Sequence, residues 1–270
     1  MFDRGIELKT PEQIDIMRKA GLVVGKTLEL LRATAAAGMT TGELDAIAHD
    51  NIRSLGATSN FLGYHGFTGV ICTSVNDEVV HGIPGGRVLN DGDIISIDCG
   101  AIVDGWHGDA ATTVAIGEVP DNVAELLRVT EESMWRGIAA AALGGRVSDI
   151  SHAIETYVDS QGDYGIVEGY TGHGIGTAMH QPPNVPNYGR PGRGPKLVKG
   201  LALAVEPMVS LGTSDTRTLA DDWTVVTGDG TWAAHFEHSF TLTDEGTWIL
   251  TALDGGEAKL KELGVPFGGR

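Results

Sequence analysis

Two aspartates, Asp98 and Asp109, lie in a segment whose pattern predicts two strands joined by a turn (IISIDCGAIVDGWHGD, residues 94–109). The isoleucines before Asp98 favour a strand, and Asp104-Gly105 is typical of a turn. An ionised carboxylate inside an apolar strand is costly to bury without a compensating partner. For one aspartate the ordinary partner is a turn or a salt bridge, so a cation site requires further ligands from elsewhere in the chain.

Such ligands occur in an order that the chain repeats. Each half contains a His-Gly-Ile triplet, then an acid six residues after a glycine (98 − 92 and 206 − 200), then a second acid close to a histidine. These histidines and acids are His81, Asp98 and Asp109 in the first half and His173, Glu206 and Glu237 in the second. The shared order predicts two homologous halves, about 10–120 and 121–252, of a single catalytic domain over residues 1–270.

If the acid-bearing strands of the two halves meet, one cleft contains four carboxylates and one imidazole: Asp98, Asp109, Glu206, Glu237 and His173. Four carboxylates repel one another and cannot all stay ionised without cations. An oxygen-rich set with one imidazole suits Mn, Fe, Co or Zn. The number of acids favours two divalent ions that share carboxylates. Such pairs lie roughly 3.5–4 Å apart and hold a bridging hydroxide, which is a hydrolytic nucleophile.

The elements that must position these residues are two helices and several strands in each half. The residues that start or cap the predicted helices are Thr10, Thr40, Asp121 and Ser148. Asp229-Gly230 predicts a hairpin turn between strands at Trp223–Thr227 and Thr231–Leu242. Two helices packed on a mainly antiparallel sheet in each half, related by a pseudo-twofold axis, predict an α+β fold.

The composition argues against some classes of binding partner. The formal net charge of −17 disfavours direct binding to nucleic acid or to a membrane surface. The loop Tyr188–Lys199, which contains several basic residues, is expected to be a solvated connector. No apolar run is long enough to cross a bilayer, and Met1–Gly5 does not begin a secretory signal. Two cysteines, Cys72 and Cys99, make no disulfide framework, so a cytoplasmic, reducing compartment is expected. No feature of the sequence indicates an oligomer, so a monomer is expected.

Five short segments resemble the ligand motifs of type I methionine aminopeptidases, and the similarity covers nearly the whole chain. The segments are Ile97-Asp98, His107-Gly108-Asp109, Gly172-His173-Gly174-Ile175-Gly176, Val205-Glu206-Pro207-Met208 and Phe236-Glu237-His238-Ser239. The resemblance implies the pita-bread fold and removal of the initiator methionine from nascent polypeptides. It also implies that Asp98, Asp109 and Glu237 hold one metal, and that Asp109, His173, Glu206 and Glu237 hold the other.

By the same resemblance, His81 lies near the substrate amine or amide and His180 near the scissile carbonyl. Both imidazoles would stabilise charge and relay protons, and Glu206 is the expected proton shuttle. The alternative for the two histidines is a hydrogen-bonded structural role. A bulky residue after methionine would collide near the scissile bond, so a small second residue is expected.

The resemblance also implies a pocket for methionine, which should be narrow, apolar and tolerant of sulfur. Its expected residues, any of which could instead be ordinary core, are Tyr64, Cys72, Phe67 and Trp223, with His65 close by. Cys72 is a candidate reactive thiol, whereas Cys99 is expected to face the core. Phe67 and Met179 depart from the tyrosine and phenylalanine common in bacterial relatives, so the shape of the pocket stays open.

Three other classes of protein fit the sequence less well. Related enzymes that cleave X-Pro bonds carry a sizeable extra N-terminal domain, whereas about one hundred residues precede Asp98 here. Type II methionine aminopeptidases carry an insertion between the histidine and the first glutamate ligand, and this chain has only 33 residues there (206 − 173). A non-catalytic binding relative would lose ligands, and all are present. The acidic composition leaves docking at ribosomes open.

Overall fold

The computed structural model describes residues 5–270, so the amino-terminal residues assessed for a secretory signal, apart from Gly5, lie outside it. The helices are α1 (Pro11–Thr34), α2 (Thr41–Ser54), α3 (Asp121–Ala140), α4 (Val147–Gln161) and α5 (Glu257–Glu262), with a 3-10 turn η1 (Tyr64–Gly66). None of the helices in the described part is long and apolar enough to traverse a bilayer.

The strands are short except for one long hairpin. They are β1 (Thr58–Ser59), β2 (Ile71–Val75), β3 (Glu78–Val80), β4 (Ile94–Val103), β5 (Trp106–Ala115), β6 (Gly165–Ile166), β7 (Gly172–Gly174), β8 (Gln181–Val185), β9 (Ala202–Val205), β10 (Met208–Ser210), β11 (Thr216–Thr218), β12 (Val225–Thr227), β13 (Ala233–His235), β14 (Glu237–Leu242) and β15 (Thr247–Ile249).

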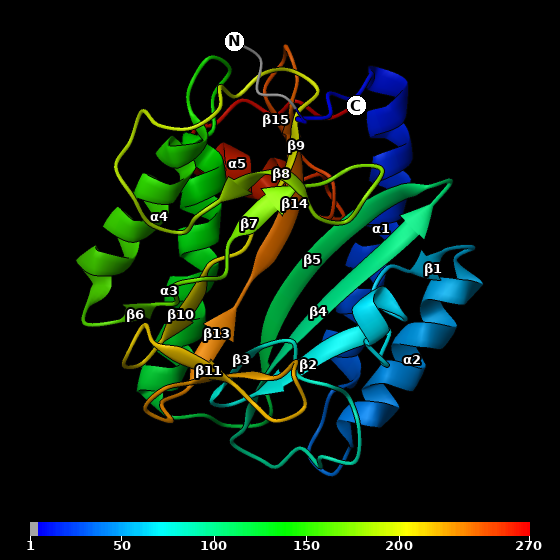
Figure 1. Cartoon of the computed structure of the whole chain (residues 1–270), viewed down its shortest axis with the longest axis vertical. Coiled ribbons are helices and arrows are strands. Elements are labelled where there is room, and N and C mark those ends of the chain that lie inside the picture. The colour runs from blue at the N-terminus through cyan, green and yellow to red at the C-terminus, as the bar shows by residue number, and fades with distance from the viewer. Residues whose placement is uncertain (1–4) are drawn as a thin grey trace.

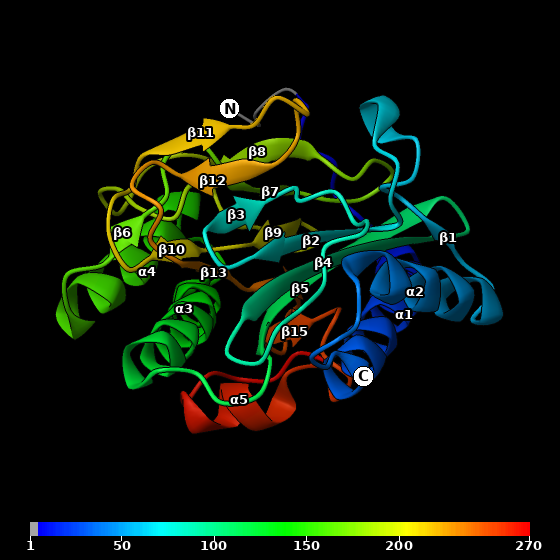
Figure 2. The same ribbon diagram turned by 90° about the horizontal axis from the view of Figure 1, so that it is seen from below.

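A nine-stranded sheet runs through both halves of the chain in the order β1-β4-β5-β14-β9-β7-β8, with β2 and β15 paired to β4 and β14. The halves join where β14 pairs antiparallel with β5. The helix pair α1 and α2 lies on one flank and the pair α3 and α4 on the other (Figure 1). Seen from below, α1, α3 and α5 lie on one side of the sheet, and β11 and β12 of a separate three-stranded sheet lie on the other (Figure 2).

Each helix pair has its own hydrophobic core. Leu31 of α1 and Leu44 of α2 pack with Ile95 and Ile97 of β4, and all four are fully buried. A separate cluster joins α3 and α4 to β9 and β14. This arrangement confirms the α+β prediction of two helices on a mainly antiparallel sheet in each half. The single domain over residues 1–270, and its division into halves of about 10–120 and 121–252, stay predictions.

Helix α1 begins as predicted, since Thr10 and Gln13 form a reciprocal capping box. The predicted start of α4 at Ser148 is wrong. The helix begins at Val147 with Arg146 as its N-cap residue, because the Asp149 carboxylate accepts a hydrogen bond from the backbone N–H of Arg146 at 2.7 Å. The Ser148 hydroxyl instead accepts from the backbone of Arg193.

The predicted hairpin at Asp229-Gly230 is also wrong. The turn itself forms, and the Asp229 carboxylate accepts hydrogen bonds from Thr213 and Thr231. However, β12 pairs with β11 and β3, whereas β13 pairs with β10, so the two strands beside this turn belong to different sheets. The expected strand Thr231–Leu242 is correspondingly broken at Phe236 into β13 and β14.

Glycines allow α1 to lie directly against β5. A Cβ atom on Gly108 of β5 would approach the backbone nitrogen of Gly21 in α1 to 2.7 Å, and one on Gly21 would reach the carbonyl of Leu250. A side chain at position 108 would therefore point at the helix. Because successive residues of a strand face opposite sides, the neighbouring Asp109 points away from the helices.

Gly108→Ala should therefore destabilise the fold, because the added methyl group meets helix backbone and not a flexible side chain. Overpacking of this kind costs about 1–3 kcal/mol, measurable as a lower free energy of unfolding in urea. The matched control is Gly86→Ala, where the added carbon has no neighbour within 4 Å. Equal stability of the two variants would contradict the close helix–strand contact.

Candidate metal centre and substrate pocket

The five predicted metal ligands lie on neighbouring strands of the large sheet. The sheet order β4-β5-β14-β9-β7 carries them in turn: Asp98, Asp109, Glu237, Glu206 directly after β9, and His173. Ala111 of β5 is in register with Asp98 on one side and with Glu237 on the other. Strand register alone therefore brings acids from both halves of the chain to one place.

The side chains form three overlapping groups, one of which joins Asp109 and His173 to His180. Asp98, Asp109 and Glu237 each offer an oxygen within 4.8 Å of the others, and His173, Glu206 and Glu237 do the same. The Nε2 atom of His173 lies 3.5 Å from Glu206 Oε1 and 3.9 Å from Asp109 Oδ2. The two ligand sets expected from the resemblance thus have their side chains together, with Glu237 common to both.

Burial makes the charges of these acids expensive. It raises the pKa of Asp98 to about 7. Burial and the charges of the neighbouring acids raise the pKa values of Asp109 and Glu237 well above the ordinary range, and the same causes act on Glu206. Without a cation, the cluster therefore keeps protons near neutral pH.

His173 is oriented as a metal ligand should be. Its Nδ1–H donates to the carbonyl oxygen of Gly174 at 2.9 Å, which leaves the lone pair of Nε2 directed at the acids. Burial lowers the pKa of His173 to about 3, so the ring is neutral at pH 7. A neutral imidazole and ionised carboxylates are the forms that bind a divalent ion.

The two predicted catalytic histidines also face this cluster. The ring of His180 lies 4.4 Å from that of His173, and its Nδ1 is 2.8 Å from the hydroxyl of Tyr64. His81 has a positive φ of 61° and packs against Tyr170 and Trp223. Burial, with His180 nearby, lowers the pKa of His81 to about 4.

A cavity of about 110 Å³ opens beside the acids. It is lined by the five predicted ligands and by the two predicted catalytic histidines, His81 and His180. The remaining lining residues are four predicted pocket residues, Tyr64, Phe67, Cys72 and Trp223, together with Phe61 and Met179. The ring centroids of Phe67 and Trp223 are 5.0 Å apart. His65 is not among the lining residues; its ring instead packs edge-on against the ring of Tyr64.

The two cysteines have different surroundings. Cys99 packs in the core formed with α1 and α2, as predicted from its position next to Asp98. Cys72 lines the cavity, but burial and the nearby Asp98 raise its pKa well above the ordinary range. Cys72 is therefore a thiol at neutral pH, which argues against the proposed reactivity.

Sequence reasoning missed three residues here. Phe61 forms part of the cavity wall, and its only signal is an aromatic residue in the same loop as Tyr64. His235 lies 3.8 Å from the carboxylate of Glu206, whereas the histidine in the predicted ligand motif is His238, next to Glu237. His238 faces the helices, where its ring packs against Trp135. Asn187 donates a hydrogen bond to the backbone oxygen of Glu206.

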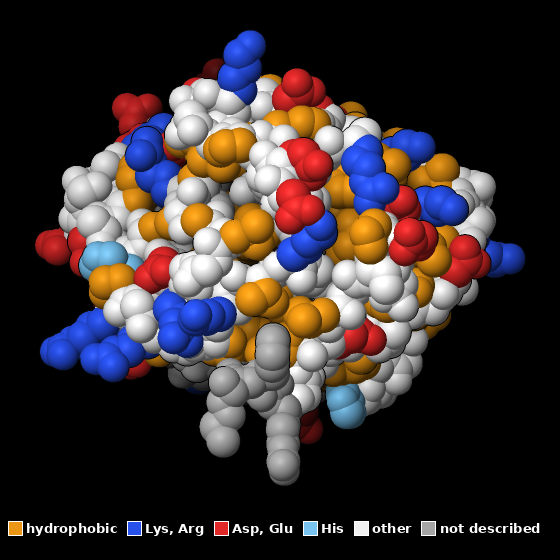
Figure 3. All heavy atoms as spheres, turned by 90° about the horizontal axis from the view of Figure 1, so that it is seen from above, with side chains coloured by type: hydrophobic (Ala, Val, Ile, Leu, Met, Phe, Trp, Pro, Cys, Tyr) orange, Lys and Arg blue, Asp and Glu red, His pale blue; other side chains and the backbone are white. Residues whose placement is uncertain are grey.

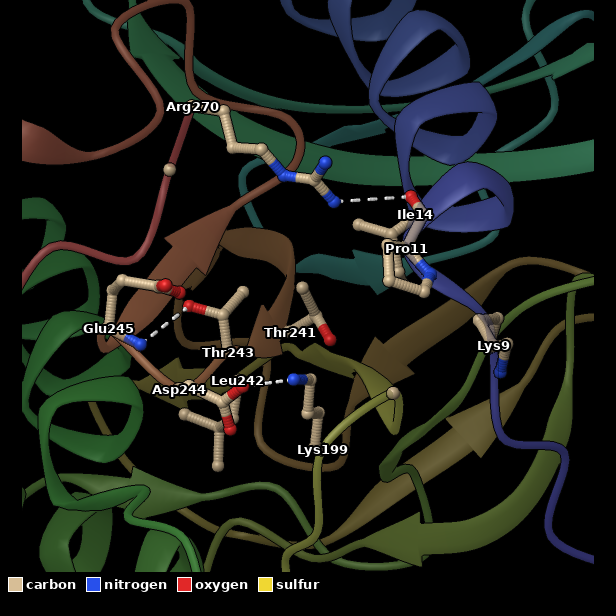
Figure 4. Close-up of a pocket in the computed structure, with 12 residues that line it drawn as sticks. Lys9, Pro11, Ile14, Lys199, Thr241, Leu242, Thr243, Asp244, Glu245 and Arg270 are labelled. Atoms are coloured by element: carbon tan, nitrogen blue, oxygen red, sulfur yellow. Dashed lines mark hydrogen bonds and ion pairs between the residues drawn. The ribbon is translucent and has the colours of Figure 1, made fainter.

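A second hollow, of about 440 Å³, lies where the carboxyl-terminal residues pass the start of α1 (Figure 4). Its polar groups are satisfied locally: Lys199 pairs with Asp244, the Thr243 hydroxyl contacts two carbonyls, and Arg270 reaches the carbonyl of Pro11. This hollow contains none of the predicted site residues.

On the face seen from above, acidic and basic side chains are interspersed (Figure 3).

Comparison with known proteins gives the family. A family model described as metallopeptidase family M24 matches residues 15–244. The chain belongs to family M24. Methionine aminopeptidase of Clostridium acetobutylicum is 54% identical over 247 residues, covering 91% of this chain and 98% of that protein.

Solved structures agree on the fold of this M24 chain. Methionine aminopeptidase from Thermotoga maritima matches with a TM-score of 0.90 and 42% identity over 92% of this chain and 99% of that one. An Xaa-Pro dipeptidase from Bacillus anthracis matches with a TM-score of 0.73 and 23% identity, and this chain covers 61% of its length. The latter shares the fold alone. These neighbours confirm the predicted pita-bread fold.

The residues present fit the divalent metal that a family M24 metallopeptidase uses. Buried oxygens of Asp98, Asp109 and Glu237 have no hydrogen-bond partner within residues 5–270. Unsatisfied buried carboxylate oxygens next to a neutral imidazole are the donors that hard and borderline divalent cations prefer. The donor set and its burial therefore suit a cation.

Metal binding should release protons, because the raised pKa values leave protons on the metal-free acids at neutral pH. One displaced proton with a pKa near 7 makes the apparent affinity for Mn about tenfold higher at pH 8 than at pH 6. Calorimetric titration of metal-free protein in buffers of different ionisation enthalpy would count the protons. Equal affinity at both pH values would contradict the protonated cluster.

Proposed function

We propose that this chain is a methionyl aminopeptidase that removes the initiator methionine of nascent polypeptides when the second residue is small. One observation carries the proposal: two overlapping ligand groups, both including Glu237, border a narrow cavity with aromatic walls. The similarity to methionine aminopeptidases over nearly their whole length supports the same activity.

Two divalent ions per chain, Co, Mn, Fe or Zn, are part of this proposal. Asp98, Asp109 and Glu237 would hold one, and Asp109, His173, Glu206 and Glu237 the other. Such ions supply Lewis acidity and an activated water when bound. The overlap of the two side-chain groups at Glu237, and the 3.9 Å between His173 and Asp109, support sharing of carboxylates between the ions.

His180 is proposed to stabilise the scissile carbonyl. If the Tyr64 hydroxyl donates to its Nδ1, the ring carries its proton on Nε2, which can then donate to the carbonyl oxygen of the substrate. His81 is proposed to hydrogen-bond the substrate amine or amide. Glu206 is proposed to move the proton from the attacking water to the leaving amine, since its carboxylate lines the cavity beside the proposed metal ligands.

The cavity is proposed to bind the methionine side chain. Its walls of Phe61, Phe67, Met179 and Trp223 are apolar, and sulfur packs favourably against aromatic rings. A volume of about 110 Å³ corresponds to only three or four water molecules, so it suits one slender side chain. His65, at the outer side of Tyr64, would contact substrate beyond this cavity. Cytoplasmic location, a monomeric state and docking at ribosomes stay predictions.

The activity can be tested on peptides with metal-free protein to which Mn, Fe, Co or Zn is added. We expect metal-dependent release of methionine from Met-Ala-Ser, much slower release from Met-Phe-Ser, and no cleavage of Ala-Pro. Asp109→Ala should lose both metal and activity while the fold survives. Equal cleavage of the two methionine peptides would refute the small-residue rule, and faster cleavage of Ala-Pro would indicate an X-Pro peptidase.

His81→Ala should keep its metal and lose turnover. Loss of a positioned acid–base group costs about 100-fold or more in kcat, whereas the ligand set is untouched. Metal content by elemental analysis and kcat on Met-Ala-Ser give the two readouts. The control is His152→Ala, which removes a solvent-facing histidine on α4. An unchanged kcat in the His81 variant would leave His81 with a structural role only.

A further inference from the structure

His235 is a buried histidine beside Glu206 to which the proposed reaction assigns no task. Its side chain is almost fully buried, and its Nε2 atom lies 3.8 Å from Oε2 of Glu206. The other carboxylate oxygen, Oε1, lies 3.5 Å from Nε2 of His173. The carboxylate of Glu206 is thus bracketed by two imidazoles, only one of which is a proposed metal ligand.

The backbone of His235 is held by a side chain from the other half of the chain. The hydroxyl of Thr113 on β5 donates to the carbonyl of His235 at 2.8 Å and accepts from its N–H at 2.9 Å. Ser96 on β4 lies 2.9 Å from the same hydroxyl, and all three residues are buried. Two buried hydroxyls therefore fix the position of one histidine.

Glu206 is fixed to the same framework. Two residues after it, Met208 is in register with His235 in the pairing of β10 with β13. The side-chain amide of Asn187, itself fully buried, donates to the backbone oxygen of Glu206 at 3.1 Å. Hydrogen bonds therefore hold the main chain on both sides of the Glu206–His235 contact.

The Nε2 atom of His235 has no hydrogen-bond partner among the residues that the structure describes. A buried polar group left in that state is destabilising, so a partner is expected in the working site. The nearest charged acceptor is Glu206, and the 3.8 Å separation exceeds a hydrogen bond by about 0.8–0.9 Å. A small rotation of the glutamate closes that gap.

We propose that His235 is a positioning residue whose Nε2–H holds Oε2 of Glu206, so that Oε1 stays directed toward the ligand side of the cluster. The inference rests on the proposed function, in which Glu206 binds metal and moves a proton. A carboxylate with one oxygen held has fewer orientations to lose at each turnover. Partners of this kind, which orient a metal ligand without touching the metal, are worth about 10–100-fold in affinity or activity.

The test compares two replacements of similar bulk. His235→Gln keeps a side-chain N–H near the same position, whereas His235→Leu fills the space without a donor. For His235→Leu we expect kcat on Met-Ala-Ser to fall about 10–100-fold with little change in KM, and Mn to bind the metal-free protein more weakly in calorimetry. His235→Gln should stay within about threefold of the wild type in both readouts, because the donor is retained.

His238→Leu is the matched control, because His238 is next to Glu237 along the chain but its ring faces α3. It should lower stability without changing kcat or Mn affinity. If His235→Leu does not fold, Thr113→Val removes the clamp on His235 and should lower kcat at unchanged KM.

Wild-type kcat and Mn affinity in folded His235→Leu, or wild-type kcat in Thr113→Val, would overturn the inference. Equal losses in His235→Gln and His235→Leu would also overturn it, because they would assign His235 to packing. A wild-type protein that neither binds Mn nor cleaves Met-Ala-Ser would instead refute the proposed function.

Discussion

The structure depends on the cost of holding four carboxylates together in a desolvated cluster. Asp98, Asp109, Glu206 and Glu237 lie within one cluster, and their pKa values are raised first by burial. In the unfolded chain such acids have pKa values near 4. The folded, metal-free protein therefore binds more protons than the unfolded chain, and it loses stability as pH rises from about 4 through the raised values. Divalent cations offset that loss, which couples the stability of this fold to the occupancy of its site.

This concentration of charge is possible because the sheet is continuous across the two halves. Hydrogen bonding between β5 and β14 aligns Ala111 with both Asp98 and Glu237, so acids from both halves come into register. The helices cover the other face, and the contact of α1 with Gly108 fixes β5 one residue from Asp109. The same strands thus bury apolar side chains toward the helices and polar ones toward the cavity, which is what alternation along a strand permits.

The sequence predicted which acids and which histidine come together because their signals are local. Asp98 and Asp109 follow strand alternation around a single turn, and the second half repeats that order. His235 and Asn187 could not be found in this way, since their contacts with Glu206 come from the pairing of β13 with β10 and from a loop after β8. The Asp229-Gly230 turn shows the same limit. Turn chemistry fixes a local change of direction, but which strand pairs with which is decided by tertiary packing. Similarly, Ser148 was an acceptable cap by type, but Asp149 already satisfied the helix start.

The proposed methionine pocket and the proposed chemistry share one side chain, because Tyr64 lines the cavity and its hydroxyl contacts Nδ1 of His180. A residue that moves Tyr64 changes both the shape of the pocket and the orientation of the imidazole. Binding energy from the methionine side chain can then be used to align His180, and contacts realised only in that alignment raise kcat and not simply affinity. Phe67 packs edge-on against Trp223 and Phe61 in the same wall. Substitutions at Phe67 or Met179 are therefore expected to act on turnover as well as on substrate range, because the cavity adjoins the acid cluster.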